Sequence, residues 1–102
     1  MAMIEITVVP VGTGSTSLSS YVAGALEKLE GKEDIHYELN PMGTVITAPS
    51  LEKLLEIARL MHESGFEKGA KRVITAIKID ERKDLQLTIE GKKDAVEKKL
   101  NG

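Results

Sequence analysis

The segment that decides the fold is Tyr37-Glu38-Leu39-Asn40-Pro41-Met42-Gly43-Thr44. Residues 35–42 alternate in character, which predicts a β-strand with one buried face, and residues 44–48 predict a second strand. Gly43 marks a tight turn or a bulge between them. A plain hairpin needs only a turn residue or two, but this one also gathers an aromatic ring, a carboxylate, an amide, a thioether and a hydroxyl. This surplus of functional groups marks a candidate site for a small heteroaromatic ligand.

Periodic patterns on both sides of this hairpin predict further strands and helices. Their order is strand-helix-strand-strand-helix-strand with a helical tail, which is typical of the ferredoxin-like βαββαβ sandwich of the α+β class. The 102 residues suit one domain, which we expect to span residues 1–102. The predicted elements are a strand over 3–11, a helix over 18–29, strands over 35–42 and 44–48, a helix from 51 to Gly65 or Gly69, a strand over 72–80, a short extended piece over 85–89 and a weak helix over 92–100.

Capping residues support both main helices. Ser17 is a suitable N-cap for the first and Ser50 for the second, because a serine hydroxyl accepts a hydrogen bond from a free helical N–H group. Gly31 fits the end of the first helix. Pro10 cannot donate to a sheet ladder, so we expect it near the end of its strand or on a sheet edge.

The two main helices are expected to cover one face of the sheet and to leave the other face open. This open face is too apolar to remain in contact with water, so we expect another subunit to pack against it. The residues predicted on it include Thr7, Val9, Val45, Thr47, Ile74 and Ala76.

The composition argues against several classes of function. The 16 acidic and 14 basic residues are well mixed and give a formal net charge of −2, so nothing favours nucleic-acid binding. No apolar run approaches the roughly 20 residues that span a bilayer, and no signal peptide is recognisable. The chain has no cysteine, which excludes disulfides, thiolate metal sites and cysteine nucleophiles. We therefore expect a cytoplasmic protein without membrane insertion.

The loop Gly12-Thr13-Gly14-Ser15 precedes a predicted helix and has more than one interpretation. Free N–H groups at a helix start attract anions, which suggests a phosphate site. The loop lacks the lysine of a P-loop and the full dinucleotide fingerprint, so a plain connection is favoured. A third interpretation, intermediate between these two, is that the loop with Thr13 forms a polar lip to a ligand pocket.

The two histidines do not predict a metal site. His36 points outward on its strand and is expected at the surface or an interface, whereas His62 lies among core positions of the second main helix. A single histidine in such a place is more often a hydrogen-bonded core residue than a metal ligand. No second histidine lies four residues away, so zinc is poorly supported.

Three charged residues follow the last predicted strand, namely Asp80, Arg82 and Asp84. One interpretation is a solvated turn with exposed ion pairs, each worth about 0–1 kcal/mol. In the other, Asp80 points into a site at the end of the sheet and Arg82 fixes it or bridges subunits. The sequence leaves both open.

The spacing reveals no nucleophile paired with a base. The serines before the first main helix are explained by capping and solvation. We therefore expect neither catalysis nor a cofactor.

Several motifs along nearly the whole chain resemble those of one family, the small stand-alone thiamine-binding proteins related to the YkoF hydroxymethylpyrimidine/thiamine-binding protein. No single motif decides the resemblance, but their order and spacing together are specific. The motifs are Val9-Pro10-Val11-Gly12-Thr13-Gly14, Ser17-Leu18-Ser19-Ser20-Tyr21-Val22, Tyr37-Glu38-Leu39, Pro41-Met42-Gly43-Thr44, His62-Glu63, and Arg72-Val73 through Lys78-Ile79-Asp80 with Arg82.

The resemblance implies a ferredoxin-like fold and dimers assembled into tetramers. It also implies binding of thiamine or its pyrimidine moiety in the cytoplasm, without catalysis. YkoF carries two such domains in tandem, whereas this chain has one. A second copy is therefore expected from another subunit, in agreement with the apolar open face.

Thiamine offers a flat aminopyrimidine and a cationic thiazolium, and the candidate residues suit both. Tyr37 could supply an aromatic wall and Met42 a soft contact, while Thr44 and Ser17 could form hydrogen bonds. Glu38 or Asp80 could pair with the protonatable ring nitrogen or offset the thiazolium charge. Tyr37 and Glu38 point to opposite faces of one strand, so both line one pocket only if a bulge or a subunit interface intervenes.

The alternative function belongs to a different class. Small ferredoxin-like domains also serve as regulatory or structural assembly modules that bind a protein partner and no small molecule. Fold alone does not separate this alternative from ligand binding.

Overall fold

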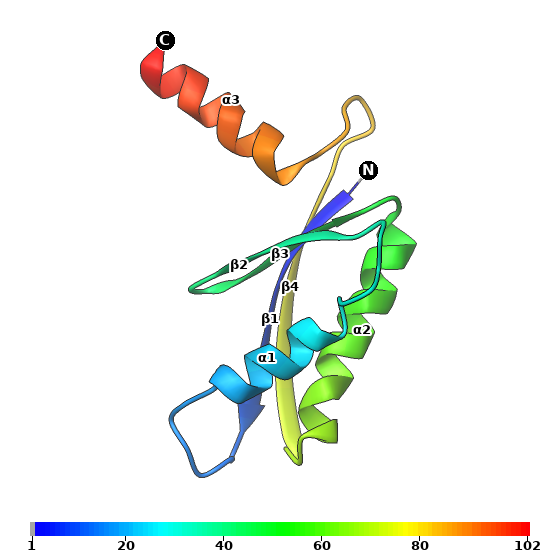
Figure 1. The fold of residues 1–102 in the computed structure, drawn as a ribbon, viewed down its shortest axis with the longest axis vertical. Helices are drawn as coiled ribbons and strands as arrows, with labels where there is room; N and C mark the ends of the chain where they lie inside the picture. Colours follow the sequence, from blue (N-terminus) through cyan, green and yellow to red (C-terminus); the bar gives the residue numbers. More distant parts are fainter. Residues whose placement is uncertain (1) are drawn as a thin grey trace.

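A four-stranded antiparallel sheet with two helices on one face forms the body of the protein (Figure 1). The computed structural model describes residues 2–102. The sheet order is β2-β3-β1-β4, and every neighbouring pair is antiparallel. The predicted ferredoxin-like βαββαβ fold with a C-terminal helix is confirmed. The elements are β1 (Ala2–Val11), α1 (Ser19–Glu27), β2 (His36–Asn40), β3 (Gly43–Ala48), α2 (Leu51–Glu67), β4 (Arg72–Glu81) and α3 (Ile89–Asn101).

The core lies between the helices and one face of the sheet. Because side chains alternate along a strand, Ile4 and Ile6 of the central strand β1 both point to this face. In the register, Ile4 lies between Ile46 of β3 and Ile79 of β4. Burying each large aliphatic side chain stabilises the fold by about 1.5–3 kcal/mol. The buried helix residues of this core are Ala25, Leu54, Ile57, Ala58 and Met61.

Helix α2 begins as the sequence predicts. The Ser50 hydroxyl accepts a hydrogen bond from the backbone N–H of Lys53 at 3.1 Å, and Glu52 lies in the positive first turn. The helix ends at Glu67, and Gly69 follows with a φ of 103°, a value that L-residues rarely adopt. Within residues 2–102, no helix combines the length and the apolar character that crossing a membrane requires.

The predicted start of α1 is wrong by one residue, and Ser17 does not cap it. Leu18 occupies the N-cap position and forms no side-chain cap, while the Ser17 hydroxyl lies 3.3 Å from that of Ser19. The clustered serines hydrogen-bond with one another and with nearby backbone, which competes with capping. The helix also ends early, at Glu27, although Leu29 in the following turn remains buried.

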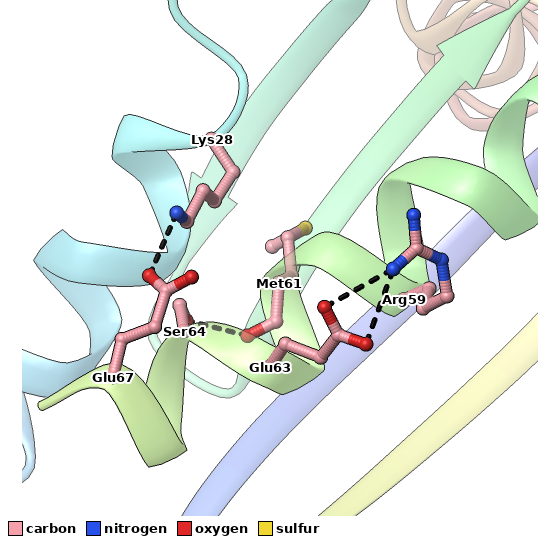
Figure 2. A network of polar contacts seen from close by, with 6 residues as sticks. All are labelled: Lys28, Arg59, Met61, Glu63, Ser64 and Glu67. Carbon is pink, nitrogen blue, oxygen red and sulfur yellow. Dashed lines mark hydrogen bonds and ion pairs between the residues drawn. The ribbon is translucent and has the colours of Figure 1, made fainter. Parts of the chain in front are cut away.

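Ionic and packing contacts hold the two core helices together. Figure 2 shows Lys28 reaching from the end of α1 to Glu67 of α2, with 2.7 Å between Nζ and Oε2. The buried Ser64 hydroxyl donates to the Met61 carbonyl at 2.5 Å within α2. An exposed ion pair contributes only about 0.2–1 kcal/mol, so apolar burial is the main source of stability here.

The opposite face of the sheet carries most of the predicted open surface, but Thr47, which was predicted on it, is buried at 3% exposure. The register places Thr7 beside Ala76 and Val9 beside Ile74 on this face. The first turn of α3 approaches this face through ion pairs to Asp80 and Glu38, and no residue of α3 is fully buried. Packing of another subunit on this face remains a prediction.

Residues 82–88 form a loop rather than continuing into an extended segment paired with the sheet. Helix α3 begins at Ile89, three residues earlier than predicted, because the Thr88 hydroxyl accepts a hydrogen bond from the N–H of Gly91 at 2.9 Å. Leu87 in the loop is buried. The sequence interpretation therefore missed a threonine cap.

Candidate ligand-binding groove

An apolar groove of about 720 Å³ opens between α1 and the sheet, at the turn that joins β2 to β3. Its volume lies within the roughly 300–1,000 Å³ typical of small-molecule sites. This turn joins the two short strands β2 and β3, and Figure 1 shows α1 crossing the helix-covered face of the sheet. The lining residues are Ile6, Thr7, Val8, Val9, Leu18, Ser19, Val22, Ala23, Ala25, Leu26, Leu39, Asn40, Pro41, Met42, Gly43, Thr44 and Met61.

The walls of the groove follow directly from the periodicity of their elements. Leu18, Val22 and Leu26 recur at four-residue spacing and therefore lie along one side of α1. Val8 of β1 packs partly against the core, and Met61 of α2 is buried. These aliphatic and thioether side chains make a wall that suits a flat aromatic ligand.

Four uncharged polar residues also line the groove, namely Thr7, Ser19, Asn40 and Thr44. Thr44 faces the helices and is only 4% exposed, whereas the Thr7 side chain alternates onto the open face, so Thr7 borders the groove only at its margin. No charged side chain lines the groove within residues 2–102. Hydroxyl and amide groups both donate and accept hydrogen bonds, so this set can orient a neutral heterocycle.

Two of the predicted site residues, Met42 and Thr44, lie together in the groove. Met42 is 86% exposed at the turn, which places it at the rim, whereas Thr44 is buried in the wall. Tyr37 points to the same face of the sheet as Leu39 and Thr44 but is not part of the lining. Tyr37 is 43% exposed as a residue, and its pair with Ile46 lies one cross-strand row away from the pair Leu39–Thr44 that lines the groove.

Thr13 and Ser17 lie in the loop that precedes α1, outside the groove lining. The Thr13 hydroxyl donates to the Ser15 carbonyl at 3.3 Å, so its hydrogen bond is local. Ser17 reaches the groove indirectly, because its hydroxyl lies 3.3 Å from the lining residue Ser19. Both residues therefore lie a few positions before the lining residues Leu18 and Ser19 in the sequence, and neither forms the wall of the groove.

Glu38 and Asp80 lie on the open face, opposite the groove. Lys93 of α3 donates to both carboxylate oxygens of Glu38, at 2.9 and 2.7 Å, and Lys92 pairs with Asp80. The hydrogen bond to Glu38, with a smaller electrostatic attraction, raises the pKa of Lys93 above its ordinary value. Within one chain, the Glu38 and Asp80 carboxylates therefore lie on the other side of the sheet from the groove that contains Met42 and Thr44.

Arg82 binds Asp84 rather than Asp80. Its Nε and one terminal nitrogen donate to the two Asp84 oxygens at 2.9 and 2.6 Å. The hydrogen bonds lower the pKa of the Asp84 carboxyl and raise the pKa of the guanidinium. Of the two interpretations of this cluster, the structure shows the exposed ion pair.

His62 has a hydrogen-bonded structural role, as the sequence indicates. Its Nδ1 lies 2.6 Å from the Thr75 hydroxyl of β4, and its ring meets Phe66 edge-on with 5.5 Å between centroids. Among residues 2–102, no three histidine, aspartate or glutamate side chains gather as a metal site would require.

Comparison with known proteins places this chain in a family. Residues 4–97 match the sequence model of a family described as thiamine-binding protein. The chain belongs to the thiamine-binding protein family.

Relatives within this family match along nearly their full length. A UPF0045 protein of Methanothermobacter thermautotrophicus is 43% identical over 98% of this chain and 100% of its own length. A UPF0045 protein of Bacillus subtilis is 41% identical over 98% of each chain. A solved structure of a hypothetical protein from Methanocaldococcus jannaschii is 35% identical and superposes with a TM-score of 0.83 over 94% of this chain and 95% of its own.

A more distant solved structure shares the fold. It is a Thermotoga maritima protein whose name proposes a role in thiamine biosynthesis or salvage. It is 24% identical and gives a TM-score of 0.75 over 93% of this chain and 97% of its own. This likeness supports the ferredoxin-like architecture of the chain.

Sequence interpretation of this family member missed most of the groove wall. Leu18, Val22 and Leu26 were recognisable as a helical stripe, but that spacing is equally typical of a closed core. Ser19 and Asn40 carried no distinguishing signal either. Whether an apolar stripe closes on the sheet or leaves a groove depends on the distance between helix and sheet, which periodicity does not encode.

Proposed function

We propose that this protein binds thiamine or its hydroxymethylpyrimidine moiety in the groove, without catalysing a reaction. One observation carries the proposal: a chain of the thiamine-binding family has an apolar groove whose polar groups are all uncharged. An aminopyrimidine is flat and carries one donor group and two acceptor nitrogens. Those features suit an apolar slot with a few hydroxyl and amide groups.

The pyrimidine half of thiamine is the part that fits inside. Thr44, Ser19 and Asn40 offer hydrogen bonds to the amino group and ring nitrogens, and Met42 and Met61 offer soft contacts to the ring. A cation is costly to bury without a counter-charge, and no acid lines the groove of one chain. The thiazolium therefore remains at the rim, where Tyr37 is near enough to serve as an aromatic wall.

The remaining candidate residues contribute from outside the wall. Thr13 and Ser17 belong to the loop before α1 and form a polar lip at the mouth. Glu38 and Asp80 would reach a ligand only across a subunit interface, where they could offset the thiazolium charge. This fits a single-domain chain, residues 1–102, that forms a homodimer and then a homotetramer in the cytoplasm.

The groove chemistry supports binding without catalysis. General acid–base catalysis needs a titratable side chain within hydrogen-bonding reach of the substrate. None of the lining residues is histidine, acidic, lysine, cysteine or tyrosine. The mixed charge of the chain likewise gives no support for a nucleic-acid partner.

Titration calorimetry with thiamine and with hydroxymethylpyrimidine tests this proposal. We expect saturable, stoichiometric binding of both, because they share the pyrimidine. Thr44→Val removes a hydroxyl from the wall at nearly constant volume and should weaken binding by about 3–10-fold, as one hydrogen bond is worth about 0.5–1.5 kcal/mol.

The matched control is Thr47→Val, which changes an equally buried threonine of β3 on the opposite face and should leave affinity unchanged. Tyr37→Ala should weaken thiamine binding more than hydroxymethylpyrimidine binding. Absence of heat with thiamine, its phosphates and hydroxymethylpyrimidine would contradict the proposal.

A second candidate function rests on the apolar open face. A regulatory or structural assembly module would use this face for a protein partner and bind no small molecule. A pull-down from native lysate that recovers one specific partner, together with silent calorimetry, would favour this alternative.

A further inference from the structure

The charged residues of this chain are distributed unevenly around the groove. Of all residues 29% are charged, yet residues 6–26 and residues 39–51 contain none. These two segments supply every residue of the groove lining except Met61, which is itself uncharged. The uncharged part of the chain and the walls of the groove therefore coincide.

The fold brings the two segments together at one end of the sheet. Pairing of β1 with β3 sets Ile6 beside Thr44, and α1 supplies the facing wall from Leu18 to Leu26. The loop before α1 belongs to the first segment, and Figure 1 shows this loop and the β2–β3 turn on the same side of the molecule. Both the walls and the loop beside them are thus uncharged.

The charged residues that border the two segments are acidic. They are Glu5 and Glu27 around the first segment and Glu38 and Glu52 around the second. The base that follows the groove residues of α1 is Lys28, and Glu67 of α2 binds it with 2.7 Å between Nζ and Oε2. The first charge beyond either segment is therefore negative, which favours a neutral or cationic ligand over an anion.

The backbone N–H groups of the loop before α1 are engaged within the loop. Ser15 donates to the Thr13 hydroxyl oxygen at 3.4 Å, and Ser17 donates to that of Ser15 at 3.1 Å. A loop that cradles a phosphate leaves such N–H groups free to point at the anion. The contacts of this loop therefore favour the plain connection over the phosphate site.

A phosphate ester differs from its parent alcohol mainly in charge. Near neutral pH it carries about 1.5 to 2 negative charges and three strong acceptor oxygens. Proteins that bury such a group supply arginine, lysine or converging backbone N–H groups, because an unpaired buried charge is costly. The groove supplies hydroxyl and amide groups from Ser19, Asn40 and Thr44, which suit an alcohol.

We propose that the groove selects hydroxymethylpyrimidine as the free alcohol and rejects its phosphate ester. This inference rests on the proposed function, which puts the pyrimidine ring inside the groove. The hydroxymethyl group is attached directly to that ring, so an ester on it enters the uncharged region together with the ring. The hydroxyl group of thiamine lies at the far end of the thiazolium half, and an ester there stays in water at the rim. The protein therefore holds its ligand ahead of phosphoryl transfer to the hydroxymethyl group.

Titration calorimetry of the full chain with four ligands tests the selection. The ligands are hydroxymethylpyrimidine, its phosphate ester, thiamine and thiamine monophosphate. We expect the ester to weaken hydroxymethylpyrimidine binding by at least about 100-fold, because the phosphate loses its hydration without gaining a cation. The same ester on thiamine should weaken binding by about 3-fold or less, because water and salt screen a charge at the rim.

Two lysine variants test whether the charge of the wall sets this preference. Ser19→Lys places a cation at a lining position and should strengthen binding of the hydroxymethylpyrimidine ester by at least about 10-fold, since a lysine–phosphate contact is a charge-assisted hydrogen bond. The matched control is Ser20→Lys, which adds the same charge at the next residue of α1, exposed and outside the lining. It should leave the preference for the alcohol as in the wild type. Circular dichroism checks that both variants remain folded, as expected at exposed positions.

The outcomes separate failure of this inference from failure of the proposed function. Equal affinity for the alcohol and the ester of hydroxymethylpyrimidine overturns the inference, as does a larger loss for the ester of thiamine than for that of hydroxymethylpyrimidine. An ester affinity that Ser19→Lys leaves unchanged overturns it as well. Silence with both alcohols, hydroxymethylpyrimidine and thiamine, is a different result, because it contradicts the proposed function itself and removes the inference with it.

Discussion

The two faces of the sheet use the same four strands for different purposes. On the helix-covered face, β1 and β3 meet α1 and α2 in a closed core that leaves one groove at the β2–β3 turn. On the open face, ion pairs join the first turn of α3 to Asp80 of β4 and Glu38 of β2. The comparison shows how strand alternation separates two roles. Tyr37 points to the side of the groove and Glu38 to the side of α3, although they are neighbours in sequence.

The largest expected effect tests whether the helix-covered face carries the stability. Leu54→Ala removes a fully buried side chain of α2 and should lower the free energy of unfolding by about 2–5 kcal/mol. Leu55→Ala changes the next residue, which is exposed, and should cost about 0.5 kcal/mol or less. Urea unfolding followed by circular dichroism measures both. Equal losses would contradict the claim that burial in the core of the helix-covered face is the main source of stability.

The next largest expected effect is a difference between the caps of α2 and α3 in how much each contributes to the free energy of unfolding. Ser50→Ala removes the cap of α2 and should lower the free energy of unfolding by about 1 kcal/mol. Thr88→Ala removes the equivalent cap of α3, which buries no side chain. It should leave the urea midpoint nearly unchanged and increase amide exchange within α3 alone. A midpoint shift as large as that of Ser50→Ala would show that α3 is part of the cooperative core.

Local sequence patterns, namely strand alternation and a capping residue before a periodic helix, were sufficient to predict some features of the two faces. Alternation in β1 and β4 was sufficient for the sheet, since Val9 and Ile74 share the open face in the register as predicted. The Ser50 cap was equally readable from its position before a periodic helix.

Other features depend on contacts that no local pattern encodes. The serines before α1 bind one another, so Ser17 does not act as the cap that its position suggested. The partners of Glu38 and Asp80 are lysines of α3, 55 and 12 residues further along the chain. The groove itself results from the spacing between α1 and the sheet. Residue types therefore suggested the turn as a site, but not its walls.

The smallest expected effect concerns the attachment of α3. The pKa of Lys93 is raised by Glu38, so the pair contributes stability below the unfolded lysine pKa of about 10.4, and that contribution is lost as the pH rises through the higher folded value. A carbon-13 titration of the Lys93 side chain should show a midpoint above the ordinary range. Glu38→Gln should return it towards that range, and no difference between the two proteins would contradict the pairing.

The most direct test of the central claim is a methyl NMR titration with thiamine. The account predicts shifts for the methyl groups of Val22, Leu26 and Met61, which line the groove on the helix-covered face. The methyl groups of Ile74 and Leu100, on the open face and on α3, should remain unshifted. Shifts confined to Ile74 and Leu100, with the groove methyl groups unchanged, would place the ligand on the other face and contradict the account.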